Sequence, residues 1–185
     1  VDNEIKKVYN GKKYFLKTYG CQMNVHDSEQ ISSYLEMLGF TKTDELVNAD
    51  IVVLNTCAIR ENAHDKVFGY LGRCKHLKKE KKDLIIILMG CMAGQVDVVE
   101  DIEKNHLRNT IVIINAEDLR AKGVNISKGL SWEKTALDFV WQMKNNPKLR
   151  YLANCTNLII PFGLEGVIYY HKELNAESKL YFLTD

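Results

Sequence analysis

The chain has 185 residues, of which 46% are hydrophobic, and 25 Lys and Arg stand against 24 Asp and Glu. This apolar content is ordinary for a globular protein and excludes wholesale disorder, and the length allows one large domain or two small ones. A near-neutral total charge gives no electrostatic argument for nucleic-acid binding, although a local basic patch can exist within the average.

No segment approaches the roughly 20 uncharged apolar residues that span a bilayer. Residues 1–13 are polar and have no apolar core of the kind found in signal peptides. We therefore expect a cytoplasmic protein without a membrane partner, whose thiols stay reduced. In that setting the five cysteines favour metal binding or catalysis over disulfides.

Strands and helices alternate along the first 115 residues. Apolar runs predict strands at residues 13–19, 51–56, 84–89 and 110–114. Apolar residues at helical spacing predict three helices: one capped by Asn24 or Asp27-Ser28 and ended by Gly39, and two at about 61–79 and 92–105. This alternation predicts an α/β fold, a mostly parallel sheet with helices on both faces that forms a three-layer sandwich.

The pattern changes beyond Asn115. An amphipathic helix is predicted around residues 132–143, ended by Asn145-Asn146-Pro147. Residues 157–160 and 166–170 are typical of two strands around a glycine turn, and the last ten residues fit one more edge strand. We therefore predict two domains, residues 1–115 and residues 116–185.

Three cysteines, Cys21, Cys57 and Cys91, each follow a predicted strand and a small or short polar residue. Because α/β sheets place ligands at the carboxyl ends of their parallel strands, these thiols are expected at one sheet edge. Three thiolates can hold an iron–sulfur cluster and leave one iron with an open position. The gaps between them match one strand–helix–strand unit each, unlike the short paired spacings of zinc fingers.

Other interpretations of the three cysteines stay open at this point. Cysteine is among the most buried residue types, so each thiol can serve only for packing. A zinc ion with three thiolates and a water is a further alternative. Cys74, on the apolar face of the second predicted helix, and Cys155, near the end of the chain, are interpreted as structural residues.

Three motifs resemble a known family. They are Tyr-Gly-Cys-Gln-Met-Asn at residues 19–24, Asn-Thr-Cys-Ala-Ile-Arg-Glu-Asn-Ala at 55–63 and Gly-Cys-Met-Ala at 90–93. In this order and spacing they resemble the N-terminal, auxiliary-cluster domain of the radical-SAM tRNA methylthiotransferases, over residues 12–100. The resemblance implies that Cys21, Cys57 and Cys91 bind a 4Fe-4S cluster with one open iron.

The resemblance also implies a reaction and its partners. Enzymes of that family insert sulfur and then a methyl group at carbon 2 of an isopentenylated adenosine beside the tRNA anticodon. The implied partners are tRNA and a sulfur donor, and the full-length enzyme uses S-adenosylmethionine at a second cluster held by a Cys-x-x-x-Cys-x-x-Cys motif. The 185 residues contain no such motif, so we expect this chain to bind a cluster without completing the reaction.

Three polar residues of these motifs are predicted to lie at the cofactor. Gln22 and Asn55 are candidates for hydrogen bonds to cluster sulfides, which would tune the reduction potential, or for ordinary loop contacts. Asn24 either orients the Cys21 loop or caps the following helix.

Residues 111–119 and 158–169 show a fainter likeness to ribokinase-like sugar kinases. These have an apolar strand followed by Asn-x-x-Glu and later a strand–Gly-x-x-Gly–strand element, but the Gly-rich catalytic motif of that family is absent here. Two alternative functions follow, a non-catalytic metal or redox-binding module and a remnant of a sugar kinase. A truncated, rearranged or fused gene would explain the junction.

Overall fold

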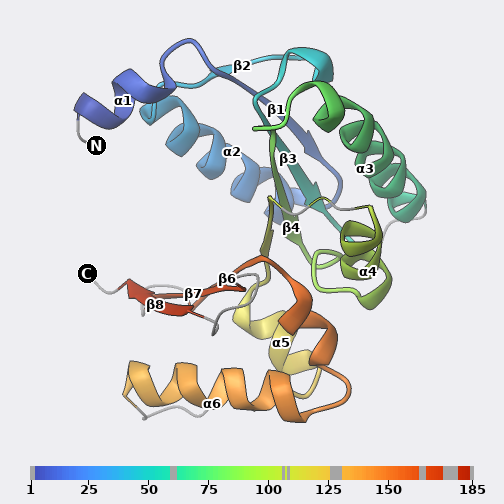
Figure 1. The fold of residues 1–185 in the computed structure, drawn as a ribbon, viewed down its shortest axis with the longest axis vertical. Helices are drawn as coiled ribbons and strands as arrows, with labels where there is room; N and C mark the ends of the chain where they lie inside the picture. Colours follow the sequence, from blue (N-terminus) through green and yellow to red (C-terminus); the bar gives the residue numbers. More distant parts are fainter. Residues whose placement is uncertain are drawn as a thin grey trace. The chain divides into compact units, whose positions relative to one another are not determined.

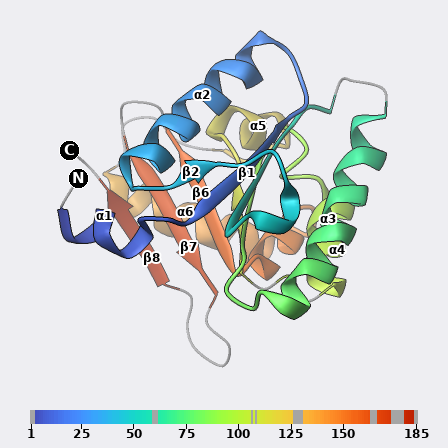
Figure 2. The same cartoon turned by 90° about the horizontal axis from the view of Figure 1, so that it is seen from above.

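A computed structural model describes residues 3–58, 62–105, 107, 109–125, 131–162, 166–172 and 179–183. The chain divides into two compact units, Val1–Met92 and Ala93–Asp185. The predicted α/β fold with a mostly parallel sheet is confirmed, since the strands of each unit pair in parallel except at the C-terminal hairpin (Figures 1 and 2). The domain boundary predicted after Asn115 stays a prediction.

The strands of the first unit are all parallel and lie in the order β2-β1-β3-β4. They are β1 (Lys13–Thr18), β2 (Thr41–Lys42), β3 (Ile51–Thr56) and β4 (Ile85–Gly90). All six residues of β3 are buried, as expected of a central parallel strand that is covered on both faces. The sheet therefore holds β1 and β4 on either side of a rigid central strand.

Helices cover both faces of this sheet. They are α2 (Gln22–Met37) and α3 (Ala63–Glu80). This unit also contains the exposed helix α1 (Asn3–Tyr9) and a short 3-10 helix, η1, at Leu46–Asn48. In Figure 1, α2 and α3 lie on opposite sides of β1, β3 and β4. The buried stripe of α3 contains Val67, Leu71 and Cys74, which is the helical periodicity that the sequence predicted.

Two features of this unit differ from the sequence prediction. Helix α2 begins at Gln22 with Cys21 as its N-cap, which is earlier than expected from Asn24 or Asp27-Ser28. Asn24 still caps the helix, from its third position, because its side chain accepts from the Cys21 backbone N–H in a capping box. Helix α1 was not predicted, because none of its seven residues, all of them described, is buried. It is only seven residues long, and its apolar residues Ile5 and Val8 are exposed, so it offers a weaker signal than the longer helices.

The second unit contains a parallel strand pair followed by antiparallel strands. Its elements are α4 (Val96–Lys104), β5 (Thr110–Ile113), α5 (Ala116–Ala121), α6 (Trp132–Asn145), η2 (Arg150–Asn154), β6 (Asn157–Pro161), β7 (Val167–His171) and β8 (Lys179–Leu183). Strands β6, β7 and β8 run side by side (Figure 2), which confirms the predicted hairpin and edge strand. The glycine turn predicted between β6 and β7 falls on residues 163–165, which lie outside the described residues.

Helix α4 begins later than predicted, because a turn at residues 91–94 precedes it.

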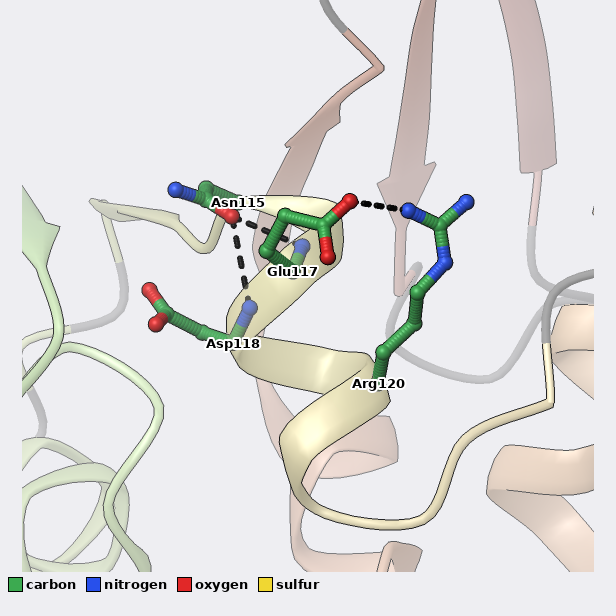
Figure 3. Close-up of polar contacts among 4 residues, drawn as sticks. All are labelled: Asn115, Glu117, Asp118 and Arg120. Atoms are coloured by element: carbon green, nitrogen blue, oxygen red, sulfur yellow. Dashed lines mark hydrogen bonds and ion pairs between the residues drawn. The ribbon is translucent and has the colours of Figure 1, made fainter.

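Asn115 caps helix α5 (Figure 3). Its Oδ1 accepts hydrogen bonds from the backbone N–H of Glu117 at 2.8 Å and of Asp118 at 3.3 Å, and Arg120 forms an ion pair with Glu117. Asn115, Glu117 and Asp118 belong to the stretch that resembles the sugar kinases, and here they form the capped first turn of a helix. Among the helices of the described residues, none has the length and apolar character needed to cross a membrane.

Candidate metal centre

Strands β1, β3 and β4 deliver three cysteines to the same edge of the first unit. The strands pair in parallel, with Thr18 opposite Asn55 and Thr56 opposite Gly90, so their carboxyl ends are in line. Cys57 and Cys91 follow β3 and β4 directly, and Cys21 follows β1 after two residues. Cys21 is exposed, Cys57 is buried and Cys91 is partly exposed. All five cysteines lie in the described part of the chain, and none forms a disulfide.

The Cys91 sulfur lies against the backbone that flanks Cys57. The N–H of Ala58 donates a hydrogen bond to Cys91 Sγ at 2.8 Å, and the same sulfur lies 3.8 Å from the carbonyl oxygen of Thr56. A backbone N–H that points at a cysteine sulfur stabilises it as a metal ligand. The Cys91 sulfur therefore lies against the backbone on both sides of Cys57, at the ends of β3 and β4.

Gly90 permits this close approach. Its φ is +91°, and a methyl group on its Cα would lie 2.0 Å from the carbonyl oxygen of Thr56 and 2.8 Å from the Thr56 nitrogen. Any other residue would force the two backbones apart, because no flexible side chain is available to move aside. This close approach to Thr56 explains why a glycine precedes Cys91.

The Cys21 loop is held by Asn24. The Asn24 Oδ1 accepts hydrogen bonds from the Cys21 backbone N–H at 3.1 Å and from the Cys21 thiol at 3.5 Å. A methyl group at Gly20, whose φ is +153°, would lie 2.0 Å from this oxygen. The glycine before Cys21 therefore makes room for the amide that contacts the cysteine.

A buried amide joins this loop to β3. Asn55 is 0% exposed, and its Nδ2 donates to the Asn24 carbonyl at 2.8 Å and to Ser28 Oγ at 2.9 Å. Its Oδ1 accepts from Asn24 Nδ2 at 3.0 Å, and Ser28 Oγ also bonds Thr18 Oγ1 at 2.7 Å. Strand β1, helix α2 and strand β3 are thus tied together by one polar network, which reaches Cys21 through Asn24.

The predicted cofactor residues fall in different environments. Gln22 is exposed on the first turn of α2, Asn24 is partly buried and Asn55 is fully buried. Sequence reasoning missed the parts played by Ser28 and by the Ala58 N–H. Ser28 could have been found, since it lies one helical turn after Asn24 and so shares its face, whereas a backbone N–H leaves no signal in a sequence. Residues 59–61 of the second motif lie outside the described residues.

The remaining two cysteines, Cys74 and Cys155, do not follow β1, β3 or β4. Burial raises the pKa of the Cys74 thiol to about 11 and that of the Cys155 thiol to about 12. Both residues are buried, Cys74 in α3 of the first unit and Cys155 before β6 in the second. Burial and the neighbouring Tyr70 likewise raise the pKa of Tyr19 to about 12, so this phenol beside the Cys21 loop is neutral at physiological pH.

These differences predict an order of alkylation in the metal-free chain. At about pH 8, a thiol with a pKa of about 11 is deprotonated in roughly one molecule in a thousand, and only the thiolate reacts. Iodoacetamide should therefore modify the exposed Cys21 well before Cys74 or Cys155, whose labelling should rise only as the pH approaches their raised pKa values. Peptide mass spectrometry over time measures this order, and equal labelling rates of Cys21 and Cys74 would contradict it.

The side chains of Cys21, Cys57 and Cys91 are thiols, the donor type that both zinc ions and iron–sulfur clusters take. Among the described side chains, no group of three or more His, Cys, Asp and Glu residues is arranged to hold one metal ion. A zinc ion needs its thiolates about 2.3 Å from one centre, whereas a four-iron cluster takes each thiolate on a different iron. Three thiols on neighbouring strand ends, with an N–H directed at one sulfur, are of the chemical kind that such a cluster takes.

Residues 13–113, more than half of the chain, match the family described as "Uncharacterized protein family UPF0004". Over 106 residues the chain is 48% identical to the tRNA-2-methylthio-N(6)-dimethylallyladenosine synthase of Halalkalibacterium halodurans and 52% identical to that of Shouchella clausii, which covers 57% of this chain and 20% of each relative. The protein of the same name from Staphylococcus saprophyticus is 38% identical over 180 residues, 88% of this chain and 35% of the relative. The chain thus spans a fifth to about a third of the length of these relatives.

Proposed function

The chain belongs to the uncharacterized protein family UPF0004, and from this membership we propose that it is the iron–sulfur cluster-binding part of a tRNA methylthiotransferase. The relatives that share its residues carry the name tRNA-2-methylthio-N(6)-dimethylallyladenosine synthase. The observation that carries the proposal is the position of three motif cysteines at the ends of three neighbouring parallel strands.

Cys21, Cys57 and Cys91 are the proposed ligands of one 4Fe-4S cluster. With three protein thiolates the cluster keeps one iron open to a sulfur species, which is the chemistry that sulfur transfer requires. The protein's own contribution is to hold the thiols in place and to direct the Ala58 N–H at the Cys91 sulfur. That hydrogen bond favours the thiolate, because a donor stabilises negative charge on the sulfur.

The proposed substrate is a tRNA that carries a dimethylallylated adenosine, in line with the printed name of the relatives. A sulfur donor and S-adenosylmethionine are proposed as further partners in the cytoplasm. The Cys-x-x-x-Cys-x-x-Cys motif that would hold the S-adenosylmethionine-cleaving cluster is absent from these 185 residues. In this proposal the chain supplies the auxiliary cluster, and other parts of the longer enzyme supply the radical chemistry.

The two alternatives are not favoured. A non-catalytic metal or redox module would use the same thiols, but it would not account for relatives that are named as tRNA-modifying enzymes. A sugar-kinase remnant would leave the three cysteines as packing residues, whereas Cys21 is exposed to solvent.

A chimera tests the proposed function. Residues 13–113 of this chain would replace the matching segment of the Shouchella clausii relative, and the hybrid would be expressed in cells that lack their own 2-methylthio modification. We expect the modified adenosine to reappear in digested tRNA, as measured by mass spectrometry. The hybrid with Cys74→Ala should retain the modification, because that thiol lies buried in α3.

The same hybrid carrying Cys57→Ala should yield none of the modified base. If a soluble hybrid restored no modification, or if Cys57→Ala left it unchanged, the proposal would be wrong.

A further inference from the structure

We infer that the side-chain amide of Asn24 is a positioning group that fixes the Cys21 ligand to the end of β3 before the cluster binds. The inference rests on the proposed function, because it concerns one of the three proposed ligands. It assigns to Asn24 a role through Cys21 and through the β3 backbone, in place of direct contact with the cofactor.

All four hydrogen-bonding positions of the Asn24 amide are used. The oxygen accepts from the Cys21 N–H and the Cys21 thiol, at 3.1 and 3.5 Å. The nitrogen donates to Asn55 Oδ1 at 3.0 Å and to the Thr56 carbonyl at 3.3 Å. An amide has two donors and two acceptor sites, so this side chain is saturated by contacts that point in two directions, to Cys21 and to β3.

The contacts on the β3 side end on a fixed anchor. Asn55 and Thr56 are both 0% exposed, and Asn55 is held in turn by Ser28 and by the Asn24 carbonyl. Cys21, by contrast, is exposed and lies in the loop between β1 and α2. The amide therefore holds the exposed Cys21 against a rigid, buried strand. Because Cys21 is already held in place, it loses less conformational entropy when the cluster binds.

The Thr56 carbonyl is also the group that the Cys91 sulfur approaches. Asn24 thus brings the Cys21 loop to the same backbone segment on which Cys91 already lies. An amide is the group that meets this requirement, since a carboxylate can accept from Cys21 but cannot donate to Asn55 or Thr56.

Four variants of the full chain separate positioning from helix capping. Asn24→Ala removes every contact, and Asn24→Asp keeps the acceptor toward the Cys21 N–H while losing both donors. Asn115→Ala is the matched control, because it removes an asparagine that caps α5 of the other unit (Figure 3). Met23→Glu, at a residue 72% exposed on the same turn of α2, controls for added negative charge.

Two measurements are made on each variant. The first is the rate at which an iron chelator removes iron from the anaerobically reconstituted chain, well below the melting temperature. We expect Asn24→Ala and Asn24→Asp to lose iron at least about tenfold faster than the wild type, as changes beside metal ligands commonly do. Asn115→Ala and Met23→Glu should lose it at the wild-type rate.

The second measurement needs no iron. It is the iodoacetamide labelling rate of Cys21 in the metal-free chain, which we expect to rise severalfold in Asn24→Ala and to stay unchanged in Asn115→Ala. Iron loss from Asn24→Asp at the wild-type rate would overturn the inference, since capping alone would then suffice, and so would unchanged Cys21 labelling in Asn24→Ala. A wild-type chain that binds no iron would instead overturn the proposed function, and the labelling rates would still decide the inference.

Discussion

Replacing Cys57 with alanine is expected to remove nearly all bound iron from a chain that remains folded. The cysteine lies at the centre of the proposed site, after the middle strand of β1, β3 and β4. Loss of one of three thiolates leaves too few ligands for a cluster that normally takes four. We expect at least about a tenfold drop in iron retained after desalting, a loss no smaller than that caused by changes beside metal ligands.

The control for this experiment is Cys74→Ala. Cys74 is 0% exposed in α3 and its thiol has a pKa raised by burial to about 11, so its removal costs packing and leaves the proposed ligands in place. Both substitutions should lower the free energy of unfolding by roughly 1 kcal/mol, as loss of a small buried group does. Equal iron retention in the two variants would argue against Cys57 as a ligand.

Gly90→Ala should both destabilise the first unit and impair iron binding. The added methyl group would lie 2.0 Å from the Thr56 carbonyl oxygen, at a residue whose φ is +91°. A non-glycine residue in this region costs about 1–3 kcal/mol before any clash with backbone is counted. We expect chemical denaturation to report a loss of at least about 2 kcal/mol, and reconstitution to report less iron, because β3 and β4 must separate where Cys57 and Cys91 emerge.

Gly69→Ala is a control that is expected to change the free energy of unfolding in the opposite direction. Gly69 lies within α3, and a methyl group there would meet nothing within 4 Å. Alanine has a higher helix propensity than glycine, so this substitution should raise the free energy of unfolding by about 0.5–1 kcal/mol and leave iron binding unchanged. If Gly90→Ala were as stable as Gly69→Ala, the close approach at Thr56 would not constrain the site.

The sheet of the first unit was predictable because its strands carry a strong signal. Residues 51–56 and 85–90 are apolar runs between turn residues, and β3 is buried at every position. Helix α3 was equally clear from the spacing of Val67 and Leu71 on its buried face. Parallel order then followed from the alternation of strands and helices, and it put the three cysteines on one edge.

Short and exposed elements were harder to predict. Helix α1 has no buried residue among its seven described residues, and α5 has six residues that depend on the Asn115 cap. Helix α2 begins one residue after Cys21, which occupies the N-cap position. Cysteine is not among the preferred capping residues, so the sequence favoured Asn24 and Ser28 instead.

The place of the three cysteines after three strands was predictable, whereas the contacts that hold them were not, and their role as ligands stays a prediction. Cys21, Cys57 and Cys91 were identified from their place after the strands and from their motifs. The network through Asn24, Asn55 and Ser28 depends on which side chains meet across three elements, and such tertiary contacts have no periodicity in the sequence.

The most direct test of the account is X-ray absorption spectroscopy of the wild-type chain, reconstituted anaerobically with iron and sulfide and analysed for both elements. If the three cysteines hold one 4Fe-4S cluster, we expect about four irons and four sulfides per chain. The iron spectrum should then show sulfur neighbours and a short iron–iron distance. A protein that keeps a single metal ion, takes up zinc in preference, or retains no iron would contradict the assignment of the three strand-end thiols to one cluster.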